Sequence, residues 1–323
     1  MDINIFYDFM SEVINSNFKS AFDLYDLETE AIPKLLHPFL QKVGLASLVG
    51  TSDSGKSTFL RQLSLAIVFK QETFLGFKID GTTHKVLYVS TEDDANAVSY
   101  AIRKQVNQLY YENDSLEKSL LKNLEFLFET ENLLSELKYK LENDPVDLIV
   151  IDAFTDVFTK ELNSNIQVRQ FLNEYDKLAK SYGCLILFLH HIGKSTMRNT
   201  PSKDSIIGSQ AFEAKMRVVL EIRPHKYNTN FKDLWVLKAN FLEAKLKAKS
   251  SVLAMDENLI FYNTGEKSEK NYIAKTNNTQ LIEKVLALYR EGHSFRKIEE
   301  MLKDTEFKIS KSAVAEIIKK YSN

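Results

Sequence analysis

The chain has 323 residues, of which 44% are hydrophobic and 27% are charged, and its formal net charge is −2. This length suffices for one large domain and a smaller one, and the composition excludes a disordered or fibrous protein. The small net charge provides no global field that attracts nucleic acid, so binding of that kind must come from local patches.

The single cysteine, Cys184, lies in an apolar run and is interpreted as a small buried residue, which is typical of proteins in the reducing cytosol. No apolar stretch reaches the roughly 18 residues that span a bilayer. The first residues, Met-Asp-Ile-Asn, lack the basic and apolar regions of a signal peptide. We therefore expect a cytoplasmic protein without a membrane partner.

Residues 1–34 mix aromatic and acidic side chains and predict a short helical lead-in, and prolines then mark the start of a main domain at 35–263. Within this domain, apolar β-type runs alternate with helical stretches. The runs are Leu45–Val49, Lys85–Ser90, Leu124–Phe128, Val146–Asp152, Cys184–His190 and Arg217–Ile222. Their continuous apolar character predicts an α/β doubly wound fold, in which helices cover both faces of a mostly parallel central sheet.

Two later β-type runs, Leu234–Leu237 and Leu259–Tyr262, predict an antiparallel extension at the sheet edge. The polar stretch 264–278 is interpreted as a linker. Residues 279–323 then predict a small all-α domain whose helices have serine N-caps at Ser294 and Ser310. The expected helices are Gln280–Glu291, Phe295–Lys303 and Lys311–Tyr321.

A phosphate-binding pattern follows the first apolar run and precedes an amphipathic helix. It reads Gly50-Thr51-Ser52-Asp53-Ser54-Gly55-Lys56-Ser57-Thr58. In such a loop the glycines let the backbone wrap a triphosphate, Lys56 reaches the β and γ oxygens, and Ser57 offers a hydroxyl to Mg²⁺. The helix that starts near Ser57 adds its positive dipole end. The pattern predicts binding of ATP with Mg²⁺, against the alternative of a coincidental turn.

Polar residues stand at or just after the ends of three other apolar runs. Asp152 is predicted to hold Mg²⁺ through water, with helix capping as the alternative. Glu92 is the candidate for polarising the attacking water, although acidic residues at this place can also simply start a helix. His191 is the candidate sensor of the γ-phosphate, and a structural hydrogen bond is the alternative. Glu92, Lys56 and His191 are thus the expected catalytic residues.

With these four elements in this order, residues 35–265 resemble the RecA-like hexameric ATPases, most closely the RepA-type replicative helicases and more distantly DnaB and KaiC. The resemblance implies a RecA-like P-loop NTPase with Glu92 as catalytic glutamate, Asp152 as Walker B residue and His191 at the sensor position. It also implies that Arg217 and Lys238 act on the nucleotide of a neighbouring subunit. Asn240 departs from the Lys-x-Arg pattern of DnaB and KaiC, and solvated surface residues are the alternative for both.

Two groups of basic residues are candidates for binding DNA. The resemblance implies that the loop containing Lys194, Arg198 and Lys203 faces single-stranded DNA in the channel of a hexamer. The C-terminal segment around 291–314 resembles the helix-turn-helix of resolvases and small regulators, with basic residues at its third helix. These are Lys308, Lys311 and Lys319. A protein-docking domain is the alternative for that segment.

The sequence therefore predicts an ATP-hydrolysing motor on single-stranded DNA, a RepA-type replicative helicase of a plasmid, phage or mobile element that forms a homo-hexamer. The alternative is an ATP-dependent switch that binds duplex DNA through the C-terminal domain and recruits or regulates partners without unwinding.

Overall fold

The structure is a computed structural model that describes residues 18–193, 199–208, 210–225, 228, 230–305 and 307–321, with the backbone alone for residues 270–279 and 320. The chain divides into two compact units, Met1–Pro33 and Lys34–Asn323. The described part of the first unit contains the short helix α2 (Ala21–Tyr25). This helix begins at a capping box, because the Ser20 hydroxyl accepts from the Asp23 N–H while the Asp23 carboxylate accepts from the Ser20 N–H. The rest of the predicted helical lead-in lies outside the described residues.

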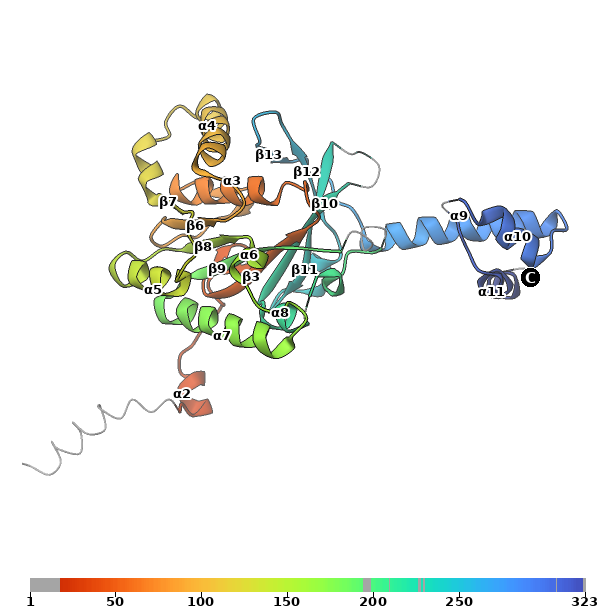
Figure 1. The fold of residues 1–323 in the computed structure, drawn as a ribbon, viewed down its shortest axis with the longest axis horizontal. Coiled ribbons are helices and arrows are strands. Elements are labelled where there is room, and N and C mark those ends of the chain that lie inside the picture. The colour runs from red at the N-terminus through yellow and green to blue at the C-terminus, as the bar shows by residue number, and fades with distance from the viewer. Residues whose placement is uncertain are drawn as a thin grey trace, which may run out of the picture. The chain divides into compact units, whose positions relative to one another are not determined.

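A nine-stranded sheet runs through the described part of the second unit (Figure 1). Its parallel strands are, in spatial order, β7 (Leu124–Leu127), β6 (Val86–Ser90), β8 (Leu148–Asp152), β9 (Leu185–His191), β3 (Gly44–Gly50) and β10 (Val218–Pro224). The antiparallel strands continue from β10 as β11 (Phe231–Ala239), β12 (Ser251–Met255) and β13 (Phe261–Asn263). The predicted α/β class with a mostly parallel central sheet is confirmed.

Helices cover both faces of this sheet (Figure 1). Leu48 belongs to the core on one face and Val49 to the core on the other, since successive side chains of a strand point to opposite faces. The core of Leu48 is closed by α3 (Lys56–Val68) and α4 (Ala95–Glu112). The core of Val49 is closed by α5 (Leu133–Asn143), α6 (Phe154–Val157), α7 (Asn165–Tyr182) and α8 (Gln210–Lys215).

Short elements connect these layers. Two small antiparallel hairpins are formed by β1 (Lys34–Leu36) with β2 (Leu40–Gln41) and by β4 (Thr73–Phe74) with β5 (Phe77–Lys78). Turns of 3-10 helix lie at η1 (Lys118–Asn123), η3 (Lys203–Ser205) and η4 (Ala244–Lys247).

The parallel register places the predicted site residues at one edge of the sheet. Gly50 pairs with His191 across β3 and β9, and Ser90 pairs with Asp152 across β6 and β8. All four stand at the carboxyl ends of their strands. In open α/β sheets, this is the edge at which ligands bind.

The antiparallel edge is joined to the helices of one layer by side-chain amides. The Gln62 amide of α3 donates to the Phe261 carbonyl at 3.0 Å and accepts from the Phe261 N–H at 2.8 Å. The Gln105 amide of α4 donates to the carbonyls of Leu259 and Thr58 at 2.8 and 3.1 Å. These bonds hold the turn between β12 and β13 against the helix that follows the phosphate-binding loop.

The C-terminal helices α9 (Lys270–Arg290), α10 (Phe295–Leu302) and α11 (Lys311–Tyr321) form their own small core, which contains Val285, Ile298 and Val314. Ser294 and Ser310 accept from backbone N–H groups at the starts of α10 and α11, as predicted. The first helix differs from the prediction, because it begins at Lys270 and not at Gln280.

The stretch interpreted as a linker, 264–278, is also different in the structure. The backbone N–H groups of Ser250 and Val252 donate to the carbonyls of Ser268 and Glu266, so residues 264–269 continue the antiparallel edge before α9 begins. A polar composition can therefore belong to ordered backbone when its neighbour is a strand edge. Among the described residues, no helix is long and apolar enough to cross a membrane.

Candidate functional site

The loop between β3 and α3 depends on two glycines. A Cβ atom on Gly50 would lie 2.5 Å from the Ile222 carbonyl oxygen and 2.6 Å from Ser54 Oγ. Gly55 has a φ of +89°, and a Cβ there would lie 2.8 Å from Cζ of Phe261. Asp53 also has a positive φ, of 59°, in the left-handed region that aspartate tolerates better than most residues. The loop therefore adopts the conformation that its sequence pattern predicts.

Lys56 lies inside this loop. Its side chain folds back so that Nζ donates to the Thr51 carbonyl at 2.7 Å, and only 5% of the residue is exposed. Burial lowers the pKa of Lys56, while the carboxylates of Asp152, Glu92 and Asp53 act in the opposite direction. The structure thus gathers the predicted carboxylates around the lysine that the motif assigns to the phosphates.

The start of α3 is open to an anion. Gly55 is its N-cap and provides no side-chain acceptor, whereas α4, α7 and α10 are each capped by a side chain. The first N–H groups of a helix have no partner within the helix and carry the positive end of its dipole. Phosphate oxygens are suitable acceptors for these groups.

Asp152 at the end of β8 faces the same loop, and one of its carboxylate oxygens is already occupied. Tyr88 of β6 donates to Oδ2 at 2.6 Å, while the buried Oδ1 has no hydrogen-bond partner among the described residues. Burial raises the pKa of Asp152, and hydrogen bonding by Tyr88 and Ser57 lowers it. A buried carboxylate oxygen beside a serine hydroxyl is the oxygen donor set that Mg²⁺ needs when phosphates and waters complete its shell. The residues therefore fit the predicted metal.

Glu92 and His191 meet beside the loop, as their predicted roles require. His191 Nε2 lies 3.6 Å from Glu92 Oε1, and half of the Glu92 side chain is exposed. The neighbouring His190 points into the core, where Phe154 and Phe212 pack against its ring and Nε2 contacts the Ile207 carbonyl at 2.9 Å. Burial lowers the pKa of His190 to about 4. The two histidines therefore serve different faces of the sheet.

The residues predicted to act in trans lie away from this edge. Arg217 is exposed at the start of β10, where its N–H donates to the Leu45 carbonyl near the amino end of β3. Lys238 of β11 is beside it and forms an ion pair with Glu213 at 2.9 Å. Neither can reach the phosphate loop of its own chain, and their action on a neighbour remains a prediction.

The basic residues predicted to bind DNA have different surroundings. Lys194 and Arg198 lie outside the described residues, whereas Lys203 forms an ion pair with Glu213 at 3.2 Å. In the C-terminal helices the predicted residues are exposed; they are Lys308, Lys311 and Lys319.

Two residues of the site were missed by sequence reasoning. Tyr88 lies in the middle of an apolar strand, where tyrosine reads as core, and only the register shows that its hydroxyl meets Asp152. Arg61 reads as a surface residue of an amphipathic helix, yet it is buried and its Nη1 donates to Asp93 Oδ2 at 2.9 Å. The available signal was the position of Arg61, five residues after Lys56 in the same helix.

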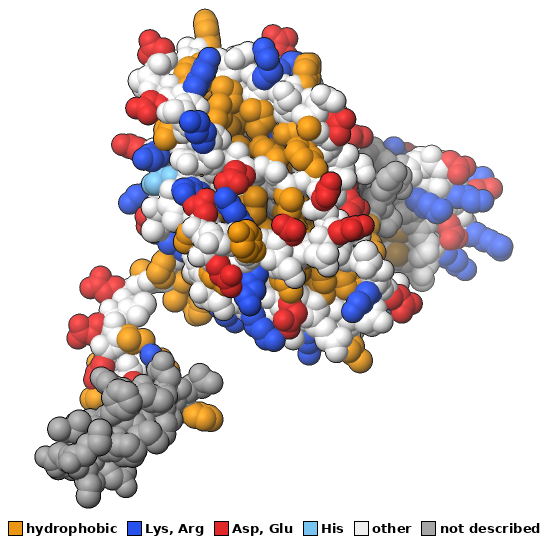
Figure 2. Space-filling model, turned by 60° about the vertical axis from the view of Figure 1, so that its left-hand side comes forward, with side chains coloured by type: hydrophobic (Ala, Val, Ile, Leu, Met, Phe, Trp, Pro, Cys, Tyr) orange, Lys and Arg blue, Asp and Glu red, His pale blue; other side chains and the backbone are white. Residues whose placement is uncertain are grey.

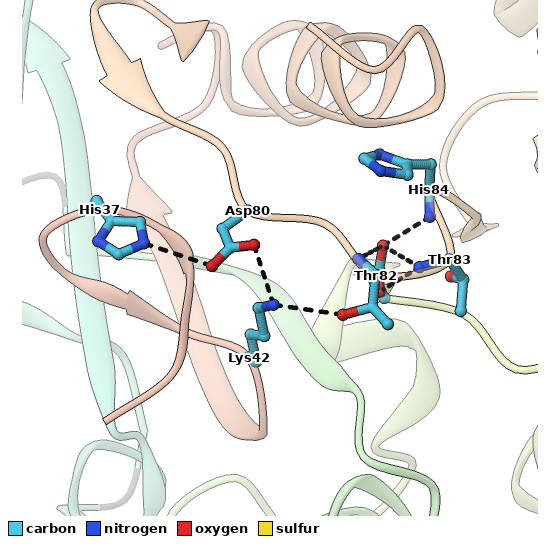
Figure 3. A network of polar contacts seen from close by, with 7 residues as sticks. His37, Lys42, Asp80, Thr82, Thr83 and His84 are labelled. Atoms are coloured by element: carbon cyan, nitrogen blue, oxygen red, sulfur yellow. Dashed lines mark hydrogen bonds and ion pairs between the residues drawn. The ribbon is translucent and has the colours of Figure 1, made fainter. Parts of the chain in front are cut away.

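A second polar cluster lies at the opposite edge of the sheet, where β6 and β8 begin (Figure 3). The Asp147 carboxylate accepts from three successive backbone N–H groups, those of Thr82, Thr83 and His84. Beside it, Asp80 is paired with Lys42 at 3.2 Å and lies 3.8 Å from His37. Because these carboxylates already have donors within the chain, the cluster fixes the loop before β6.

A parallel α/β sheet whose strand leads through such a loop into an uncapped helix defines the P-loop class of nucleotide-binding proteins. A family model described as AAA domain matches residues 15–197, which is more than half of the sequence. The chain belongs to this family of RecA-like ATPases.

Two known proteins are similar to the chain. It is 30% identical over 155 residues to the DNA repair protein RadA of Chlamydia trachomatis serovar D, a match that covers 47% of this chain but only 28% of RadA. The solved ATPase domain of a helicase has a similar structure, with a TM-score of 0.53 and 12% identity over 75% of this chain and 95% of that domain. At this identity, the second similarity concerns the fold alone.

Proposed function

We propose that the chain hydrolyses ATP with Mg²⁺ and works as a motor on single-stranded DNA, in the manner of a RepA-type replicative helicase of a plasmid, phage or mobile element. The proposal rests above all on one observation. Three strands, β3, β8 and β9, together with the loop after β6, bring Lys56, Asp152, His191 and Glu92 to one edge beside an uncapped helix.

Each residue has a role that its surroundings support. Lys56 and the first N–H groups of α3 bind the β and γ phosphates, and Ser57 and Asp152 are the protein ligands for Mg²⁺. When bound there, Mg²⁺ neutralises charge on the phosphate oxygens. Glu92 accepts a proton from the water that attacks the γ-phosphorus as the bond to the β-phosphate oxygen breaks and ADP leaves. His191, 3.6 Å from Glu92, senses whether the γ-phosphate is present.

The similarity to a protein named for DNA repair supports DNA as the partner. On the face seen in Figure 2, basic and acidic side chains are interspersed over the larger unit, so that face has no single-sign field for a phosphate backbone. We place DNA contact elsewhere, on the loop of Lys194, Arg198 and Lys203 in a homo-hexamer. Exposed Arg217 and the less accessible Lys238 are its candidates for contacting the nucleotide of the next subunit.

The decisive experiment measures ATP turnover by the full chain with and without single-stranded DNA. Turnover should rise several-fold with DNA, Lys56→Ala should lose ATP binding, and Glu92→Gln should bind ATP without cleaving it. Glu136→Gln, a neutralised exposed glutamate of α5, is the matched control and should behave as wild type. Normal hydrolysis by Glu92→Gln would show that the base is another group.

A second candidate function is supported by the C-terminal helices. Their third helix, α11, begins at the exposed Lys311 and carries exposed Lys319 about two turns later, which suits contact with duplex phosphates. In this case the ATPase acts as a switch that recruits or regulates partners. ATP-dependent duplex binding that survives Glu92→Gln and is lost in Lys311→Glu would favour the switch, whereas stimulation of turnover by single-stranded DNA favours the motor.

A further inference from the structure

Glu92 lies in a short loop whose two neighbouring residues are both held from other elements. The preceding residue, Thr91, is fixed to the end of β8, since its N–H and its hydroxyl donate to the Asp152 carbonyl at 2.8 and 2.9 Å. The Thr91 hydroxyl oxygen also accepts from the Ala153 N–H at 3.0 Å. The loop is thus attached on one side to the strand that provides the metal-binding carboxylate.

On the other side of Glu92, Asp93 is fixed to the helix after the phosphate loop. Arg61 Nη1 of α3 donates to Asp93 Oδ2 at 2.9 Å, and the Ser90 hydroxyl donates to the Asp93 carbonyl at 2.9 Å. The next residue, Asp94, is the N-cap of α4 and accepts from the Ala97 N–H at 2.8 Å. The backbone on both sides of Glu92 therefore has defined partners, while its carboxylate extends toward His191.

Arg61 is an unfavourable residue to bury at this place. Its side chain is only 7% exposed, and its Nε has no hydrogen-bond partner among the described residues. A buried cation costs free energy unless it is paired with opposite charge, and a well-packed apolar side chain often serves stability equally well. The rest of the helix buries mainly apolar side chains, such as Leu60 and Leu63. The ion pair with Asp93 is thus better explained by positioning than by stability.

We propose that Arg61 is a positioning residue for ATP hydrolysis, which acts through Asp93 to hold Glu92 in place relative to the phosphate loop. The role rests on the proposed function, because it requires Glu92 to be the base. Lys56 and Arg61 belong to the same helix, so the lysine that binds phosphate and the loop that carries the base share one rigid support. A displacement of α3 on nucleotide binding or release moves both together.

The test compares Arg61→Gln and Asp93→Asn with wild type in steady-state ATP turnover and in binding of ATP by calorimetry. We expect kcat to fall about tenfold or more in each single variant, because general base catalysis depends on a placement that the ion pair supplies. The dissociation constant of ATP should stay within about twofold, since neither residue belongs to the phosphate loop. The double variant should be no slower than the single ones, as expected for two residues that act as one unit. Asp93→Glu, which retains the carboxylate, should recover most of the activity.

Lys140→Gln is the matched control. Lys140 forms partly buried ion pairs with Glu125 and Asp144 at 2.6 and 2.8 Å near the opposite edge of the sheet, and its loss should leave kcat unchanged. An equal loss of kcat in this control would mean that broken ion pairs act through general destabilisation, and the positioning role would be overturned.

A cycle with Glu92→Gln separates positioning of the base from other effects. If Arg61 acts through Glu92, Arg61→Gln causes no further loss of the residual rate in the Glu92→Gln background. Further loss there, or a raised Mg²⁺ requirement in Arg61→Gln but not in Asp93→Asn, would show that the cation acts on Asp152 and would overturn the proposal. Wild-type protein that binds but never hydrolyses ATP would refute the proposed function itself. Fast hydrolysis by wild type and by Asp93→Asn alike would refute the positioning role alone.

Discussion

Gly55→Ala is expected to destabilise the chain for a reason unrelated to phosphate binding. Gly55 has a φ of +89°, and a Cβ there would lie 2.8 Å from Cζ of Phe261, whose ring is buried in β13. A left-handed backbone costs a residue with a Cβ about 1–2 kcal/mol. Inserting a methyl group into packed surroundings costs about 1–3 kcal/mol more. The free energy of unfolding should therefore fall by about 2–5 kcal/mol.

A second glycine separates these two contributions. Gly183 ends α7 with a φ of +67°, and a Cβ there would meet no heavy atom within 4 Å among the described residues. Gly183→Ala should therefore cost only the backbone part, about 1–2 kcal/mol. The difference between the two variants measures the contact with Phe261.

Urea unfolding followed by tryptophan fluorescence is a suitable assay. The chain has one tryptophan, Trp235, which is fully buried in β11, so its signal follows the sheet even if the C-terminal helices unfold separately. Phe261→Leu should restore part of the stability lost in Gly55→Ala by making room for the methyl group. Equal losses in Gly55→Ala and Gly183→Ala, or no rescue by Phe261→Leu, would show that the ring does not restrict this position.

Two further predictions concern pH. Tyr88→Phe removes a hydrogen bond that lowers the pKa of Asp152, so this pKa should rise and the acidic limb of the ATPase pH profile at saturating Mg²⁺ should move to higher pH; an unmoved limb contradicts the link. His190 has its pKa lowered from 6.5 to about 4 by burial, so the unfolded chain takes up the proton first and stability is lost as the pH falls across this range. His190→Gln should flatten the unfolding free energy between these pH values in urea titrations, and an unchanged slope relative to wild type would exclude His190 as its source.

The sheet could be predicted because its strands are apolar on both faces. The predicted run Cys184–His190 corresponds to β9 at Leu185–His191, and Val146–Asp152 contains β8 at Leu148–Asp152. Burial on both faces leaves a continuous signal that does not depend on where the neighbouring strands lie. The residues at the carboxyl ends of these strands were predictable for the same reason.

The antiparallel edge and the first C-terminal helix could not be predicted equally well. β12, Ser251–Met255, follows a lysine-rich stretch and is only five residues long, so its apolar run is brief. The start of α9 contains asparagines and threonine, which have low helix propensity and resemble a linker in composition. Order in this region comes from backbone pairing with residues 250–252, and composition carries no signal for such pairing.

Within the site, the sequence identified residues that act by position along the chain but missed those that act through a partner. Lys56 and Ser57 belong to a local pattern, and Asp152 ends a recognisable strand. Arg61 and Tyr88, in contrast, gain their significance from Asp93 and Asp152, which are 32 and 64 residues away. Their chemistry exists only once the strands are ordered side by side.

The two residues implied to act in trans differ in how readily each could do so. Arg217 is exposed and forms no ion pair within the described residues, so its guanidinium is available to a neighbouring nucleotide. Lys238 donates to the Glu213 carbonyl at 2.8 Å and is paired with its carboxylate, which also binds Lys203. To reach a phosphate, Lys238 must leave Glu213, but Lys203 can then neutralise that carboxylate. An exchange of lysines at Glu213 would therefore couple the nucleotide of one subunit to the loop proposed to bind DNA.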